Sequence, residues 1–86
     1  MAVVYILQCA DGTLYTGWTT DLERRLQAHN SGQGAKYTRG RRPVTVVYHE
    51  EQPTRSVAQR REAAIRRLSR ADKLKMIEGK QNDNEN

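Results

Sequence analysis

Two short apolar runs near the start of the chain predict a β-hairpin. AVVYILQ, residues 2–8, and TLYTG, residues 13–17, flank the turn pair Asp11-Gly12, and Asp-Gly between such runs is a strong hairpin signal. Side chains alternate between the two faces of a strand, which divides the first run into Val3, Tyr5 and Leu7 on one face and Val4, Ile6 and Gln8 on the other. Both faces are largely apolar, so we expect a central strand that is covered on both sides.

A helix and a long loop follow the predicted hairpin. Thr20 and Glu23 form a capping-box pattern that predicts a helix to about Asn30. The inner face of this helix carries Leu22, Leu26 and His29. The next segment, SGQGAKYTRGRRP over residues 31–43, contains three glycines and four cations and is predicted as a loop. A loop of this length in so small a domain is usually functional or disordered.

The second half of the chain predicts one strand and two helices. VTVVY, residues 44–48, predicts the strand, and residues 55–68 predict a helix. Ser69 and Asp72 mark the start of the last helix, which we expect Gly79 to stop, leaving residues 80–86 as a disordered polar tail. The order β-β-α-β-α-α predicts an α+β fold, in which a three-stranded antiparallel β-sheet is flanked by helices in one domain over residues 1–79.

Composition narrows the class of protein. A chain of 86 residues, 36% of them hydrophobic and none of them Phe, allows one small domain around a modest core. The single cysteine, Cys9, cannot form an internal disulfide, whereas small domains of oxidising compartments usually carry several. No Lys or Arg precedes the opening apolar run, which is too short to span a bilayer. We therefore expect a cytoplasmic protein without a signal peptide or a membrane partner.

The positive charge is concentrated in the middle of the chain. The formal net charge is +5, made up of −1 over residues 1–34, +7 over residues 35–73 and −1 over the remainder. A basic stretch of this kind attracts polyanions through phosphate contacts and counterion release. Nucleic acid is therefore the leading partner, and a solvated basic surface that only helps solubility is an equally weighted alternative.

Glu62 and Arg25 lie at the edges of the apolar helix faces. Glu62 falls beside Ala58 on a helical wheel, where it either pairs with Arg66 at i,i+4, worth ~0.3 kcal/mol, or holds a hard cation such as Mg²⁺. Arg25 falls beside Leu22 and His29, whereas Arg24 points to solvent. A half-buried guanidinium can stabilise charge in phosphoryl transfer, but packing of the Arg25 stem is the ordinary interpretation.

Tyr5 and Tyr15 lie on the two arms of the predicted hairpin. They are either core aromatics or a proton-transfer pair, and a Tyr that acts as a base at neutral pH needs positive charge nearby. His29 follows Arg25 by one helical turn and could assist proton transfer or serve in the core. The sequence contains no zinc spacing, Ser/His/Asp arrangement, P-loop or dinucleotide fingerprint, which leaves a metal-assisted phosphate site.

With these residues in view, the chain resembles the GIY-YIG nuclease superfamily from Val3 to about Ile77. Its two name-giving motifs are present as VVY, ending at Tyr5, and YTG, ending at Gly17. The tracts YTGWTTDLERRLQAHNSG and GAKYTRGRRPVTVVYHE, with the RRE segment and a Lys-bearing last helix, are similar to the small stand-alone YhbQ-like branch. Val3 and Thr16 replace the first Gly and the middle Ile of the motifs, which affects positioning more than chemistry because both tyrosines are present.

The resemblance implies a one-metal endonuclease that hydrolyses phosphodiester bonds and leaves a 5′ phosphate and a 3′ hydroxyl. It implies that Tyr5 is the general base, that Tyr15 supports it, and that His29 is an auxiliary residue. Arg25 would stabilise the pentavalent phosphate, and Glu62 would bind one Mg²⁺ or Mn²⁺. Nucleic-acid contacts are expected at Gly17, Lys36, Tyr37, Arg39, Arg41 and Arg42.

Two other functions remain open at this point. The chain could be a non-catalytic nucleic-acid-binding module, or an adaptor that brings this fold to a larger repair complex through a protein partner. The sequence favours DNA of the repair or recombination type because it carries no sequence-reading domain. It does not distinguish DNA from RNA, define the substrate structure or set the oligomeric state.

Overall fold

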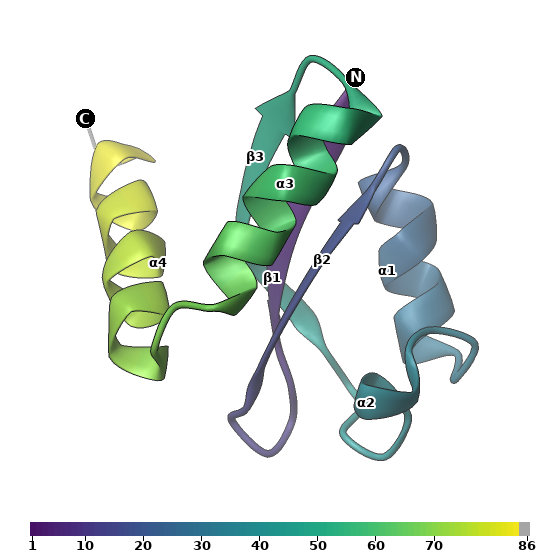
Figure 1. Ribbon diagram of the computed structural model, residues 1–86. Helices are drawn as coiled ribbons and strands as arrows, with labels where there is room; N and C mark the ends of the chain where they lie inside the picture. Colours follow the sequence, from purple (N-terminus) through teal and green to yellow (C-terminus); the bar gives the residue numbers. More distant parts are fainter. Residues whose placement is uncertain (85–86) are drawn as a thin grey trace.

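The computed structural model describes the backbone of residues 1–84 and the side chains of residues 1–80. Its elements, shown in Figure 1, are strands β1 (Ala2–Gln8), β2 (Leu14–Thr19) and β3 (Thr45–Gln52) and helices α1 (Leu22–Asn30), α2 (Lys36–Arg39), α3 (Arg55–Arg66) and α4 (Arg70–Asn84). The predicted α+β fold with one three-stranded antiparallel sheet is confirmed.

The sheet has the order β2-β1-β3, so the first strand is the central one, as its two apolar faces predict. β1 pairs antiparallel with both neighbours. In this register Tyr5 lies opposite Gly17 on β2 and His49 on β3. An irregularity between Ile6 and Leu7 shifts the pairing with β3 by one residue. β2 and β3 are the two edge strands of the sheet.

Each face of β1 contributes to its own core cluster. Val4 and Ile6 pack with Ala58 and Ile65 of α3, whereas Tyr5 and Leu7 pack on the opposite face toward α1. In Figure 1 α3 crosses in front of the sheet and α1 lies beyond the β2 edge. Fully buried side chains occur in both clusters, and truncating such a side chain to Ala typically costs about 2–5 kcal/mol.

Helix α1 begins one residue later than the capping-box pattern predicts. Its N-cap is Asp21, whose Oδ1 accepts a hydrogen bond of 3.1 Å from the Arg24 amide. The Asp21 amide in turn donates to Thr19 Oγ1 at 3.2 Å, while Thr20 is exposed. Asp is at least as good an N-cap as Thr. The hydrogen bond to the Thr19 hydroxyl also closes the turn that precedes α1, which favours Asp21 over Thr20 as the N-cap.

Three further predictions are corrected by the structure. Residues 36–39 of the predicted loop form the short helix α2, and β3 extends to Gln52. Gly79 does not stop the last helix, because it has no positive φ and α4 continues to Asn84. Residues 80–84 of the predicted tail are therefore helical, and the remaining two tail residues lie outside the described part of the chain. Ser69 Oγ accepts from the Asp72 amide at 3.2 Å, as the predicted helix start implies.

No helix within the described residues is both long and apolar enough to cross a membrane.

Candidate active site

A buried hydrogen-bonded chain joins β1, α1 and α2. The Tyr5 hydroxyl lies 3.1 Å from Nε2 of His29, and Nδ1 of His29 lies 2.8 Å from Oγ1 of Thr38. Thr38 donates its single hydroxyl proton to the Ala35 carbonyl oxygen at 2.9 Å, so its oxygen must accept from the imidazole. His29 therefore carries its proton on Nδ1, and its free Nε2 accepts from the Tyr5 hydroxyl.

Burial sets the proton affinities of this pair. Burial raises the pKa of Tyr5 above its usual range and outweighs the opposing effect of the Arg25 positive charge. Burial and the charge of Arg25 both lower the pKa of His29. At neutral pH the pair is thus a protonated phenol facing a neutral imidazole. The positive charge that a basic Tyr needs is supplied by Arg25, but its effect on the pKa of Tyr5 is smaller than that of burial.

Tyr15 joins this group from the neighbouring strand. Its ring centroid lies 5.4 Å from that of His29 in an edge-on arrangement and 5.7 Å from that of Tyr37 in a stacked one. The structure thus brings both motif tyrosines onto His29. Tyr15 also connects the buried chain to an exposed ring on α2, because Tyr37 is 39% exposed.

The glycine of the second motif makes room for Tyr5. A Cβ on Gly17 would lie 2.6 Å from the Tyr5 hydroxyl oxygen, closer than real Cβ contacts come, and 3.2 Å from the Tyr15 ring, which is tight. Gly17 is buried, so its part in the site is to admit the phenol rather than to present a surface. Gly34 is similar, because a Cβ there would collide with His29 Nδ1.

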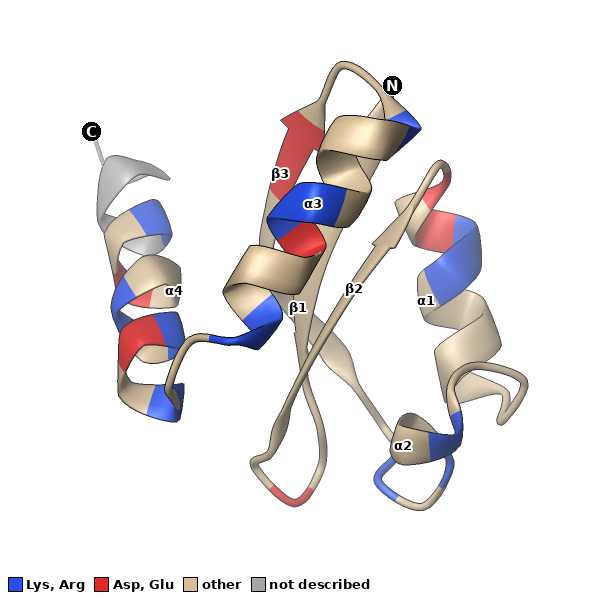
Figure 2. Cartoon of the chain, viewed as in Figure 1, with Lys and Arg blue, Asp and Glu red and all other residues tan. Residues whose placement is uncertain are grey.

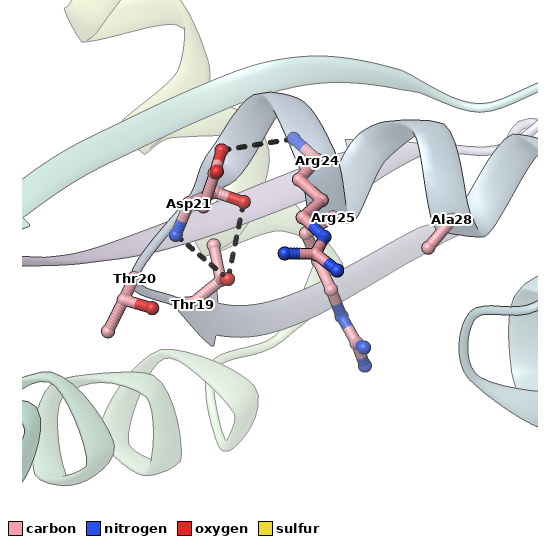
Figure 3. Close-up of a pocket in the computed structure, with 6 residues that line it drawn as sticks. All are labelled: Thr19, Thr20, Asp21, Arg24, Arg25 and Ala28. Carbon is pink, nitrogen blue, oxygen red and sulfur yellow. Dashed lines mark hydrogen bonds between the residues drawn. The ribbon is translucent and has the colours of Figure 1, made fainter.

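Arg25 lies in a pocket of about 270 Å³ beside the start of α1, shown in Figure 3. The lining residues are Thr19, Thr20, Asp21, Arg24, Arg25 and Ala28. Arg25 is half-buried whereas Arg24 is exposed, as the helical wheel predicts. The positive charge of Arg25 also acts to lower the pKa of Tyr5, against the larger effect of burial, so Arg25 lines this open pocket and acts on the buried tyrosine as well.

Glu62 provides a buried carboxylate on α3. It is 6% exposed, and its Oε1 accepts from Nη2 of the exposed Arg66, one turn later. Its charge is felt at the Tyr5 hydroxyl, where it contributes to the raised pKa. The described residues contain no cluster of three or more His, Cys, Asp or Glu that could hold a metal ion. A lone carboxylate fits only a hard cation that keeps most of its water, as Mg²⁺ does.

The predicted nucleic-acid contacts divide into two groups. Lys36 and Arg39 are exposed on α2. Arg41 and Arg42 are engaged within the fold, because Arg41 bonds to Asp11 Oδ2 and the Tyr37 carbonyl and Arg42 to the carbonyls of Asn30 and Arg39. Figure 2 shows blue segments on α2, α3 and α4, so the basic middle stretch is spread over several elements.

Sequence reasoning missed one residue of this site and one buried hydroxyl on the opposite face of the sheet. Thr38, fully buried, fixes the His29 tautomer from a position nine residues away, and no local pattern marks it. Thr16 is 4% exposed, and its Oγ1 has no hydrogen-bond partner among the described residues. Thr16 is a polar residue between the apolar Leu14 and Trp18 on one face of β2, and this pattern is visible in the sequence.

Comparison with known protein families gives a match over most of the chain. Residues 1–75 match the family described as "GIY-YIG catalytic domain". The chain is 54% identical over its whole length to the UPF0213 protein CPE1444 of Clostridium perfringens, covering 92% of that protein. It is 57% identical over 81% of its length to the UPF0213 protein VNG_2274C of Halobacterium salinarum, covering 91% of that protein.

Two solved structures share the fold. One is the solution structure of the UPF0213 protein BH0048 from Bacillus halodurans, with a TM-score of 0.58 and 47% identity over 91% of this chain and 84% of that one. The other is the solution structure of the protein EF2693 from E. faecalis, with a TM-score of 0.61 and 44% identity over 92% of this chain and 84% of that one.

Proposed function

Because the chain belongs to the GIY-YIG family, we propose that it is an endonuclease that hydrolyses phosphodiester bonds of nucleic acid with one divalent metal ion. The substrate we propose is DNA of the repair or recombination type. The observation that carries the proposal is the buried Tyr5–His29 hydrogen bond with Arg25 beside it. This arrangement offers a proton acceptor and a cation to the same phosphate.

Proton transfer runs through Tyr5 and His29. The Tyr5 oxygen takes a proton from the attacking water while its own proton moves along the 3.1 Å contact to Nε2 of His29. The raised pKa of Tyr5 argues against a free phenolate, so the two transfers are concerted. His29 suits the acceptor role because its pKa is lowered and it is neutral near pH 7.

Arg25 stabilises the negative charge that develops on phosphorus-bound oxygens. Arg25 lines the open pocket and its charge acts on the Tyr5 hydroxyl, so a phosphate held in this pocket would lie near the water that Tyr5 activates. The bond to the 3′ oxygen breaks as the water oxygen bonds to phosphorus, and the 3′ oxygen takes a proton from solvent, which leaves a 5′ phosphate and a 3′ hydroxyl. A positioned donor of this kind is worth about 10²–10³ in rate.

Glu62 is the residue that would hold the metal ion. When bound, Mg²⁺ or Mn²⁺ would supply positive charge for the leaving 3′ oxygen. The ion pair with Arg66 must open to free the carboxylate oxygen that Arg66 now occupies. That same ion pair is the observation that favours the other function, a non-catalytic nucleic-acid-binding module in which Glu62 serves only the fold.

The test is cleavage of labelled single-stranded, duplex, flapped and four-way DNA in Mg²⁺ or Mn²⁺. Wild type is compared with Arg25→Ala and with Arg67→Ala, which removes an exposed cation from the end of α3. Metal-dependent cutting that is lost in Arg25→Ala and kept in Arg67→Ala supports the nuclease. Salt-sensitive binding without cutting in either metal favours the binding module, and full activity that requires a second protein favours the adaptor.

A further inference from the structure

A second pocket lies across the edge strand β2, next to the proposed active site. It has a volume of about 240 Å³ and is lined by Leu14, Tyr15, Thr16, Tyr37, Arg66 and Lys73. These residues come from β2, α2, α3 and α4, and Figure 1 shows the first half of β2 between α2 and the α3–α4 connection. The pocket is below the ~300–1,000 Å³ of drug-sized ligand sites, so it suits one flat group.

The aromatic wall of this pocket is rigid although it is exposed. Tyr37 stacks against Tyr15, and the Arg41 guanidinium carbon lies 4.1 Å from the Tyr37 ring centroid. Arg41 is itself held, because its Nη1 donates to the Tyr37 carbonyl at 2.7 Å and its Nε to Asp11 Oδ2 at 3.1 Å. Because Tyr15 and the Arg41 guanidinium already lie against this ring, a base that stacks on Tyr37 takes the place of the guanidinium.

The opposite wall and the floor of the pocket are polar. Arg66, which pairs with Glu62, and Lys73 carry the positive charge of this wall, and Lys73 suits a phosphate beside an inserted group. Thr16, which also lines the pocket, is buried and carries the hydroxyl that has no partner among the described residues. Its oxygen is enclosed, so the polar groups that a ligand meets first are those of Arg66 and Lys73.

We propose that this pocket is a subsite for one unpaired nucleobase of the DNA strand being cut. The inference rests on the proposed nuclease function and defines its substrate further. Aromatic side chains with flanking cations are the features by which proteins bind single-stranded nucleic acid. Tyr15 belongs both to this pocket and to the group around His29, so a base held here is close to the phosphate under attack. Fully paired duplex cannot enter, because its bases are stacked.

The experiment uses a short single strand with one 2-aminopurine, moved base by base along the strand, and no divalent metal. Wild type and Tyr37→Phe should quench the probe at one position, whereas Tyr37→Leu should not. Tyr37→Leu should also weaken binding about 5- to 150-fold, the range for loss of one base–aromatic stack. Lys73→Gln should weaken binding, and Lys75→Gln, on the same helix but beside a different pocket, should not.

Circular dichroism of each variant first establishes that it is folded. Unchanged affinity and quenching in folded Tyr37→Leu would overturn the subsite, even if wild type cuts DNA. Cleavage of the unmodified strand is measured in parallel with Mg²⁺. If binding depends on Tyr37 but no DNA is cut, the base subsite is supported and the nuclease function is rejected. Failure of the subsite and failure of the nuclease function therefore give different results.

Discussion

The Tyr5 hydroxyl lies 3.1 Å from Nε2 of His29, and the two residues are 24 positions apart on β1 and α1. The contact depends on the register that places Gly17 opposite Tyr5 and on the Thr38 hydroxyl behind His29. It couples a phenol of raised pKa to an imidazole of lowered pKa. The first three predictions concern this contact and the protonation of His29.

Replacing His29 by Gln should reduce cleavage strongly while binding is retained. Gln offers no basic nitrogen to receive the Tyr5 proton, and general-base groups contribute about 10²–10⁴ in rate. Single-turnover rates at saturating protein measure the effect without interference from binding. A loss smaller than about threefold at pH 7 would contradict the role of His29 as proton acceptor.

Cleavage and stability should both fall at acidic pH because of His29. Its pKa is lowered in the folded state, so the unfolded chain binds more protons as pH falls below the unfolded value of about 6.5. The free energy of unfolding should therefore decrease as pH falls from above 6.5 through the folded pKa. Denaturant unfolding at several pH values, with His29→Gln as reference, measures this slope, and equal slopes in the two proteins would refute it.

Replacing Thr38 by Val should impair catalysis through the tautomer of His29. Thr38 is fully buried, and its Oγ1 accepts a hydrogen bond of 2.8 Å from Nδ1 of His29. A Val side chain would leave that N–H without a partner, at a cost of about 1–3 kcal/mol. The rate should fall, and the pH dependence of the rate should shift with it. Thr38→Ser, which keeps the hydroxyl, should restore both, and an equally inactive Ser variant would indicate a packing role instead.

Replacing Gly17 by Ala should reduce cleavage, because the new Cβ would lie 2.6 Å from the Tyr5 hydroxyl oxygen and displace it. The matched control is Gly40→Ala, where a Cβ meets nothing within 4 Å and φ is negative. Cleavage rates and thermal unfolding of both variants measure the effect. Wild-type activity in Gly17→Ala would show that the position of the Tyr5 hydroxyl is not critical.

Replacing Arg66 by Gln should strengthen metal binding. Arg66 is 66% exposed and pairs with Glu62 at i,i+4, and such pairs are worth about 0.3–0.5 kcal/mol, which corresponds to about a twofold change in affinity. Titration with Mn²⁺, followed by electron paramagnetic resonance without DNA, isolates this effect. Weaker Mn²⁺ binding in Arg66→Gln would mean that Arg66 supports the site rather than competing with the ion.

Local patterns predicted the sheet and its central strand, because alternation along residues 2–8 leaves both faces apolar and this requires cover on both sides. They also placed Arg25 and Glu62 at the edges of helix faces. They failed where tertiary contacts decide the outcome. The hydroxyl of Thr19 bonds to the Asp21 amide and so favours Asp21 over Thr20 as the N-cap of α1. Thr38 is part of the site only because α2 packs beside α1. The spread of positive charge predicted phosphate contacts but not that Arg41 and Arg42 bond within the fold.

The most direct test of the proposed nuclease compares Glu62→Gln with Glu78→Gln in single-turnover cleavage of DNA with Mg²⁺. Glu62 is a buried carboxylate whose charge acts on Tyr5, whereas Glu78 is exposed on α4. Glu62→Gln should lower the rate at least ~10²-fold, as expected when one group that stabilises the transition state is removed, and Glu78→Gln should match wild type. Equal metal-dependent rates in the two variants would place the metal elsewhere and contradict the mechanism.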